Sequence, residues 1–239
     1  MKIENIRCFE DFAQALLEAG FSMGGGNDEG IFAVIPFSWN QEPPFDTPVR
    51  WHTGNPETDP WEWRVRVLIE RDDVAYGKFF LKKSGYITRE WFPHFIAARR
   101  GDATMIEHYF DGHASREAKQ IYEIISAAEG GVLDVEEIKR LGSFKKEDKS
   151  RFDRALTELQ MGLFITMCGT NRRISSTGKE FGWNSMMYCT TEAFWGPEVF
   201  EKAAEITYDD AISSITAQIL KLNPAAEAKK ITKFINALK

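Results

Sequence analysis

The spacing of apolar side chains predicts a mainly helical α+β protein. In the first half of the chain, apolar residues recur every three or four positions in some segments and cluster with β-branched and aromatic residues in others. These patterns predict helices over 8–19, 61–71 and 89–100, and strands over 31–37, 74–81 and 85–88. Asp59 and Pro60 suit the N-cap and first turn of the second helix, and its predicted inward side chains are Trp61, Val65, Leu68 and Ile69.

The second half shows three helices followed by β segments. Ser115 and Asp134 are natural N-caps of the first two helices, and glycines end both. The third and longest helix is predicted over 146–161. β segments are predicted over 163–168, 171–175 and 186–190, and two further helices over 208–220 and after Asn223-Pro224. Three helices followed by a β-hairpin are typical of a winged helix-turn-helix.

We therefore expect tandem winged helix-turn-helix units with small β-hairpin wings. The first unit, 1–113, is predicted to be α+β with a degenerate winged helix, because a helix there is followed by a basic hairpin. The second unit, 114–192, is the clearer winged helix-turn-helix. Residues 193–239 are predicted to form a helical extension at the C-terminal end.

Charge is distributed unevenly along the 239 residues. The net charge is −6, which argues against a protein that coats nucleic acid indiscriminately. Residues 1–63 nevertheless carry a net charge of −8, whereas residues 64–100 carry +5. No apolar run is long enough to span a membrane and the start of the chain lacks an apolar leader, so we expect a soluble, cytoplasmic protein.

The strongest indication of function is the basic stretch 139–154, where a recognition helix would begin. In a helix-turn-helix the second helix enters the major groove, and lysine and arginine side chains neutralise phosphates. We expect DNA contacts from Lys146, Lys149, Arg151 and Arg154, and from Arg172 and Arg173 in the wing. The alternative is a solvated charged face on a winged-helix fold that packs against protein partners only.

A second cluster lies between Asp59 and Arg66 and in the hairpin that follows. Trp61 and Trp63 could stack a flipped base while Glu62 handles a proton or a water molecule. The further DNA-binding candidates of this region are Arg64, Lys78, Lys82 and Lys83. The alternative is that these aromatic residues belong to the core and the acidic residues to a loop.

Neither a metal site nor a cofactor site is expected. The four histidines, at 52, 94, 108 and 113, do not show the spacing of metal ligands on one helix face. The three cysteines lack the close C-x-x-C pairing of zinc sites and are odd in number, which argues against a disulfide framework. No Ser/His/Asp or Cys/His order is recognisable.

Several stretches resemble the AlkZ-related winged-helix family, relatives of the AlkZ or YcaQ type of DNA glycosylase. They are WHTGNPETDPWEWR, AYGKFFLKKSGYITREWFP, REAKQIYEII, KEDKSRFDRALTELQMGLFITMCG and RRISSTGKEFGW. The resemblance implies tandem winged-helix units that form a concave, DNA-facing surface. Its glycosylases carry a Gln-x-Gln catalytic motif, which this sequence lacks because its glutamines, at 14, 41, 120, 160 and 218, are all isolated.

Three hypotheses follow. The first is a DNA-binding protein that recognises duplex DNA, including damaged or structured DNA. The second is a glycosylase-like enzyme acting on a base, with Glu62 as its acid or base. The third is a protein-interaction module without DNA binding. The lesion, the DNA sequence, the protein partners and the oligomeric state stay open.

Overall fold

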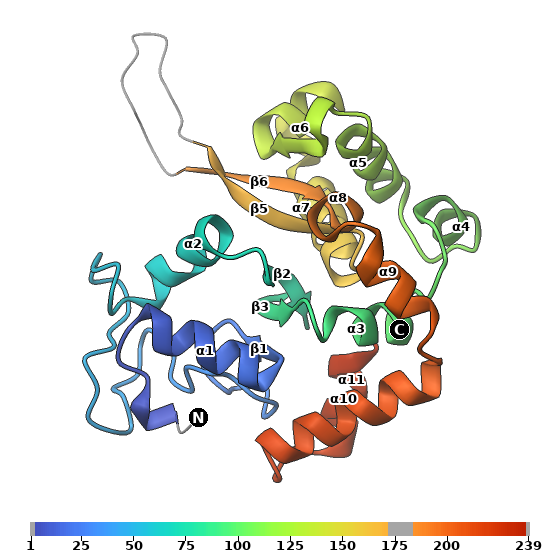
Figure 1. Ribbon diagram of the computed structural model, residues 1–239. Helices are drawn as coiled ribbons and strands as arrows, with labels where there is room; N and C mark the ends of the chain where they lie inside the picture. Colours follow the sequence, from blue (N-terminus) through green and yellow to red (C-terminus); the bar gives the residue numbers. More distant parts are fainter. Residues whose placement is uncertain (1–2, 172–183, 238–239) are drawn as a thin grey trace, which may run out of the picture.

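The computed structural model describes residues 3–171 and 184–237 and shows a mixed α+β fold (Figure 1). A six-stranded antiparallel sheet is surrounded by helices, which confirms the predicted α+β class. The strands are β1 (Phe21–Met23), β2 (Val74–Phe80), β3 (Lys83–Thr88), β4 (Val132–Asp134), β5 (Ile165–Asn171) and β6 (Ser185–Thr190).

Helices make up most of the regular structure. In the first half they are α1 (Phe9–Ala19), α2 (Pro60–Glu70), α3 (Phe92–Arg99) and α4 (Met105–Phe110). In the second half they are α5 (Arg116–Ser126), α6 (Val135–Leu141), α7 (Lys149–Met161), α8 (Thr191–Trp195), α9 (Pro197–Ala204), α10 (Tyr208–Leu222) and α11 (Ala228–Ile235). Short 3-10 turns lie at Ile3–Asn5, Glu129–Gly131 and Lys146–Asp148.

The sheet consists of two three-stranded sets with the same internal order. In the first set β1 pairs with β3, and β3 pairs with β2. In the second set β4 pairs with β6, and β6 pairs with β5. The sets join where Tyr76 of β2 lies opposite Met167 of β5. The two sets therefore follow one another in opposite order across the sheet, β1-β3-β2 and then β5-β6-β4. Helix α7 packs against β2 of the first set, and α2 packs against β5 of the second.

Three predicted helix starts are confirmed by their capping bonds. The side chains of Asp59, Ser115 and Asp134 accept hydrogen bonds from the first-turn N–H groups of α2, α5 and α6. These bonds satisfy donors that a helix leaves free at its N-terminus. The sequence therefore locates the beginnings of these helices correctly.

Two details of the sequence prediction for the first half are wrong. Residues 31–37 do not form a strand, although most are buried; the segment is an irregular stretch whose Val34 N–H donates to the Ser22 hydroxyl at 2.9 Å. Helix α2 buries Trp63 and Val67 rather than Ile69, which is 70% exposed, because the core lies on another of its faces.

The final helix begins at Ala228 rather than after Asn223-Pro224. Asn223 instead follows α10 directly, and its N–H donates to Ile219 O. Its side-chain amide donates to the carbonyl oxygens of Gly30 and Ile31, at 3.1 and 2.6 Å. This bonding ties the end of α10 to the irregular buried segment of the first half.

The two halves are joined at a buried guanidinium. Arg99, the last residue of α3, donates to Phe79 O of β2 and to Met161 O of α7, both at 2.9 Å. It also donates to Phe234 O and Ile235 O of α11, at 3.2 and 3.0 Å. The chain ends next to α3 in Figure 1. Burial lowers the pKa of Arg99 to about 9. This value is still above neutral pH, so the guanidinium stays protonated and keeps all its donors.

The C-terminal helices pack against the first half of the chain. Helices α9, α10 and α11 all contact α3, and their buried side chains belong to the same core as the sheet. The boundaries of the units, 1–113, 114–192 and 193–239, stay a prediction.

Replacing Arg99 by Met is expected to lower the free energy of unfolding by at least about 3 kcal/mol, since it strips a donor from each of four buried carbonyls. Urea denaturation followed by circular dichroism measures this change. The exposed Arg89→Met is the control, expected within about 0.5 kcal/mol of wild type. Equal stability of the two variants would contradict the role given to Arg99.

Candidate nucleic-acid interface

A basic groove of about 410 Å³ lies between α6 and the start of α7. It is lined by Glu136, Lys139, Arg140, Phe144, Lys145, Lys146, Lys149 and Phe152. The chain reverses between the two helices at Ser143, which has a φ of 54°, and the 3-10 turn then leads into α7. Phe144 packs edge-on against the buried Phe152, with ring centroids 5.1 Å apart. This contact holds the turn, and with it the cationic side chains, against the core.

The cations of this groove differ in their partners. Lys149 binds Asp153 at 2.8 Å and Lys139 binds Glu136 at 3.3 Å. The hydrogen bond to Asp153 raises the pKa of Lys149. Arg151 pairs with Asp148 and Glu117. In the described part of the chain, no ion pair joins a carboxylate to the side chains of Arg140, Lys145, Lys146 and Arg154, although the Asp148 carboxylate accepts from the Lys145 N–H at 2.9 Å, and this hydrogen bond and the charge of Lys145 help to lower the pKa of Asp148. These four are therefore the cations most open to an external anion.

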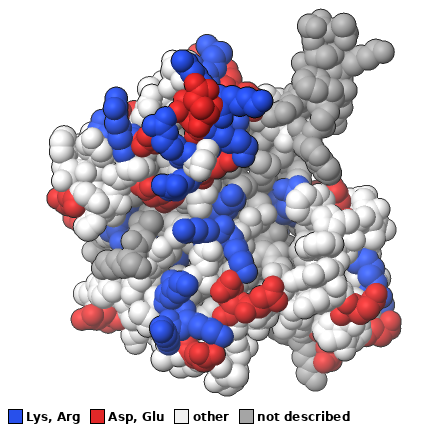
Figure 2. All heavy atoms as spheres, turned by 180° about the vertical axis from the view of Figure 1, so that it is seen from behind, with Lys and Arg blue, Asp and Glu red and all other residues white. Residues whose placement is uncertain are grey.

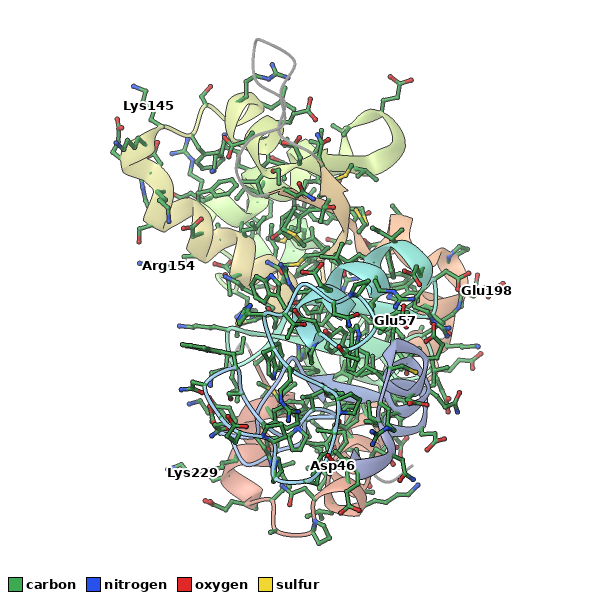
Figure 3. All side chains as sticks on the ribbon, turned by 90° about the vertical axis from the view of Figure 1, so that its left-hand side faces the viewer. Asp46, Glu57, Lys145, Arg154, Glu198 and Lys229 are labelled. Carbon is green, nitrogen blue, oxygen red and sulfur yellow. The ribbon has the colours of Figure 1, made fainter. Side chains whose placement is uncertain are left out.

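The groove belongs to one face of the molecule. In Figure 3, Lys145, Arg154 and Lys229 project to the same side, whereas Glu198 lies on the opposite side. Figure 2 shows this face: lysine and arginine side chains gather over its upper part, with acidic side chains between them, and in smaller groups below. Cationic side chains from distant parts of the sequence therefore reach one surface of an anionic protein.

The predicted basic residues of the first hairpin differ in their surroundings. Lys78 is on β2, and its N–H donates to the side chain of Gln160 in α7 at 2.9 Å. Lys82, in the β2–β3 turn, is exposed and has a φ of 64°. Lys83 is also exposed, but it pairs with Glu29 at 2.6 Å. Arg172 and Arg173 lie outside the described residues.

A second cavity, of about 220 Å³, opens between α2 and the β2–β3 hairpin. Its walls are largely aromatic and carry two cations: Met23, Gly24, Gly25, Ser38, Trp39, Trp51, Pro60, Trp61, Arg64, Tyr76, Lys83, Ser84 and Tyr86. Trp39 is 70% exposed, whereas Tyr76 and Tyr86 are buried. We call this cavity the aromatic pocket.

Close packing shapes the aromatic pocket. The guanidinium of Arg64 lies 3.7 Å from the ring centre of Trp61, and no partner is found for its buried Nε. Trp51 donates from Nε1 to Phe37 O at 3.1 Å. A Cβ on Gly24 would come within 2.8 Å of Ser84 O, so a side chain there would displace the hairpin. Gly24 and Gly25 thus form part of the pocket wall where larger residues would not fit.

Asp59 fixes Trp61 at the edge of this pocket. The carboxylate is completely buried and accepts hydrogen bonds from the N–H groups of His52, Thr53, Gly54 and Trp61, at 2.7 to 3.0 Å. It caps α2 and closes the loop before it at the same time. The ring of His52, in that loop, lies 4.9 Å from the ring of Trp61.

The other predicted residues of this cluster lie elsewhere. Trp63 is fully buried and packs on Phe12, and its Nε1 donates to Pro56 O at 3.1 Å, so it offers no free ring face for stacking. Glu62 is partly exposed on the first turn of α2 and does not line the aromatic pocket. The structure therefore brings Trp61 and Arg64 together but leaves Trp63 and Glu62 apart from them.

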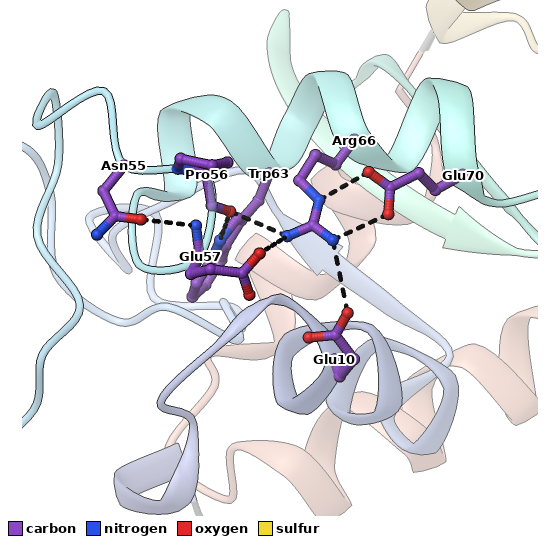
Figure 4. A network of polar contacts seen from close by, with 7 residues as sticks. All are labelled: Glu10, Asn55, Pro56, Glu57, Trp63, Arg66 and Glu70. Atoms are coloured by element: carbon purple, nitrogen blue, oxygen red, sulfur yellow. Dashed lines mark hydrogen bonds and ion pairs between the residues drawn. The ribbon is translucent and has the colours of Figure 1, made fainter.

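Arg66, two positions after Arg64, forms ion pairs with three carboxylates (Figure 4). It pairs with Glu70, Glu57 and Glu10 at 2.7, 3.0 and 3.5 Å. The hydrogen bonds to Glu70 raise the pKa of Arg66 and lower that of Glu70. This surface of α2 is therefore neutralised, in contrast to the start of α7.

The sequence did not reveal four aromatic residues of the pocket, Trp39, Trp51, Tyr76 and Tyr86. They come from loops and strands that the sequence separates widely, and a scatter of aromatic residues has no periodic signature. The pKa of Tyr86 is raised well above its usual value, chiefly by burial and further by the nearby Tyr76, while Arg64 acts to lower it. The only sequence signal was the glycine run, which allows Trp51 and Ser84 to approach closely.

The described residues contain no group of three or more His, Cys, Asp or Glu side chains placed to hold a metal ion. In the same residues, every helix is too short or too polar to cross a bilayer. Cys8, Cys168 and Cys189 are free thiols.

Comparison with known proteins gives one match. The model of the AlkZ-related family matches residues 6–236, which is nearly the whole chain. The chain belongs to the AlkZ-related family. No curated protein and no solved structure matches it. The family relates this chain to AlkZ-type DNA repair proteins.

The AlkZ-related chain uses two of its isolated glutamines to connect structural elements. Gln160 is buried: its amide donates to Leu156 O at 2.8 Å, while its oxygen accepts from Lys78. Gln218 donates to Ala19 O at 2.8 Å. Neither glutamine lines the aromatic pocket.

Asp59→Ala is expected to lower the free energy of unfolding by about 2 kcal/mol or more, because four backbone N–H groups lose their acceptor. It should also shift tryptophan emission to longer wavelength as Trp61 becomes exposed. Urea denaturation and fluorescence spectra check both effects. The exposed Asp46→Ala, from the same long loop, is the control, and an equally small change in both variants would contradict the role of Asp59.

Proposed function

We propose that this protein binds duplex DNA through the face that carries the α6–α7 groove, with α7 as the helix that enters the major groove. The order α5, β4, α6, α7, β5, β6 and the strand pairing β4–β6–β5 support this proposal. They correspond to a winged helix-turn-helix, in which the helix before the hairpin reads DNA. The predicted contacts Arg172 and Arg173 belong to the β5–β6 connection, outside the described residues.

The first half supports a tandem arrangement. It runs α1, β1, α2, β2, β3 with the pairing β1–β3–β2, which repeats the second half without its middle helix. The long segment 24–59 stands where α6 stands in the second unit. We infer two winged-helix units whose sheets are joined edge to edge by the pairing of β2 with β5. The first is degenerate in the sense that a loop replaces one helix.

The two units differ in charge, and this difference selects the second for duplex binding. On α2, Arg66 is saturated by three carboxylates. At the start of α7, Lys145, Lys146 and the preceding Arg140 line a groove and have no carboxylate partner in the described residues. Bound phosphates would release counterions at these cations without first breaking an internal ion pair. The unpaired cations of this groove are the observation that carries the proposal.

The acidic total charge is compatible with such binding. With a net charge of −6, the protein repels DNA in most orientations, so association is confined to the face where cations gather. A uniformly basic protein would bind in many registers. Here the opposing charge of the remaining surface would favour a single orientation of the duplex.

The test is the salt dependence of binding to a 20-base-pair duplex, measured by fluorescence anisotropy. Lys145→Gln is expected to weaken binding and to reduce the slope of log K against log salt concentration by about 0.9, the loss of one phosphate contact. Arg89→Gln removes the same charge from a residue paired with Glu198, on the opposite side of the molecule, and is expected to leave the slope unchanged.

An affinity that does not depend on salt would overturn the proposal. Equal slopes for the two variants would show that the groove does not contact phosphate. Because both variants have the same net charge, a difference between them cannot come from overall charge alone.

A further inference from the structure

We propose that the aromatic pocket binds one unpaired nucleobase of the bound DNA and holds it without cutting its glycosidic bond. This inference rests on the proposed function and names a ligand for a second site of the protein. The ligand class is a planar heteroaromatic base with hydrogen-bond acceptors on its edge, such as guanine.

The size of the pocket suits one base. Drug-sized ligands occupy cavities of roughly 300 to 1,000 Å³. The aromatic pocket, at about 220 Å³, is smaller and has room for a single flat ring system rather than a whole nucleotide. A base that enters it must first leave the duplex stack, as in other proteins that act on or read extruded bases.

The walls offer stacking surfaces and a cation. Indoles and a guanidinium plane are the groups on which unstacked bases pack in nucleic-acid complexes. Trp39 is 70% exposed at the pocket, and Trp61 supports the guanidinium of Arg64 at 3.7 Å. Among the described residues, no hydrogen-bond partner is found for the buried Nε of Arg64. Arginine pairs preferentially with the acceptor edge of guanine.

The lining holds no carboxylate that could activate water. Hydrolysis needs a positioned group that takes a proton from water, and a histidine or a carboxylate serves most often. None of the lining residues is Asp, Glu or His. Glu62 lies outside the lining, Lys83 is held in an ion pair with Glu29, and Tyr76 and Tyr86 are buried. The walls therefore suit recognition of a base better than its hydrolysis.

The pocket is mechanically connected to the duplex-binding helix. Tyr76 of β2 lines the pocket, and two residues later the N–H of Lys78 donates to Gln160 of α7. Strand β2 therefore connects the pocket to the C-terminal end of α7, whose opposite end lines the basic groove.

The experiment compares two duplexes of equal length, one fully paired and one with a single unpaired guanine bulge, by anisotropy at fixed salt. The wild type is expected to bind the bulged duplex about tenfold more tightly, the effect of stacking one base. In Trp39→Ala the ratio should fall to about one. Phe110→Ala removes another exposed aromatic side chain, on α4 and away from the pocket, and should keep the wild-type ratio.

The possible outcomes separate the two proposals. Salt-dependent binding of both duplexes with equal affinity would overturn the pocket proposal and leave duplex binding intact. If neither duplex binds, the proposed function fails, and titration of tryptophan fluorescence with guanosine still tests the pocket: quenching in the wild type, lost in Trp39→Ala, supports it, and no quenching overturns it. Alkali-labile breaks at the bulge after incubation would overturn the statement that the base is not excised.

Discussion

The buried guanidinium of Arg99 is the interaction on which the arrangement of the two halves depends. Its donors reach the end of α7, the end of α11 and strand β2, and a helix C-terminus leaves its last carbonyls without intrahelical partners. A desolvated charge is costly, and burial accordingly lowers the pKa of Arg99, but four carbonyl oxygens compensate for the lost water. The directional fork of arginine connects three elements that no single neutral side chain could join.

This constraint fixes the geometry of the functional surface. Because Arg99 binds Phe79 O and Met161 O together, β2 cannot slide along α7 without breaking both bonds. The hydrogen bond from the N–H of Lys78 to Gln160 adds a second link one residue earlier in both elements. The α6–α7 groove and the aromatic pocket are thus connected through one frame, although their residues come from different halves of the sequence.

The sequence predicted local features better than the assembly. Caps at Asp59, Ser115 and Asp134 were predictable because each depends on residues within three positions. The inward face of α2 was not, since Trp63 turns toward Phe12 of α1 and toward Pro56, contacts that no periodicity specifies. Residues 31–37 combine strand composition with an irregular backbone, because Ser22 and Asn223 supply the hydrogen bonds that a neighbouring strand would otherwise provide.

The candidate site shows the same division. The basic start of α7 is contiguous in the sequence and could be predicted. The aromatic pocket is assembled from six separate segments, and of its side chains the sequence had grouped only Trp61, Arg64 and Lys83 in one cluster. The decisive difference between Arg64 and Arg66, two residues apart, is also tertiary.

Arg64 and Arg66 therefore have different roles. Arg66 faces three carboxylates and contributes to stability, whereas Arg64 stacks on Trp61 beside an open cavity. Had both been neutralised, the first half would be a structural support only; had both been free, its helix would compete with α7 for phosphate. With Arg66 paired and Arg64 stacked beside the cavity, the first half keeps a small cationic pocket, and our proposal assigns the duplex to α7 of the second half.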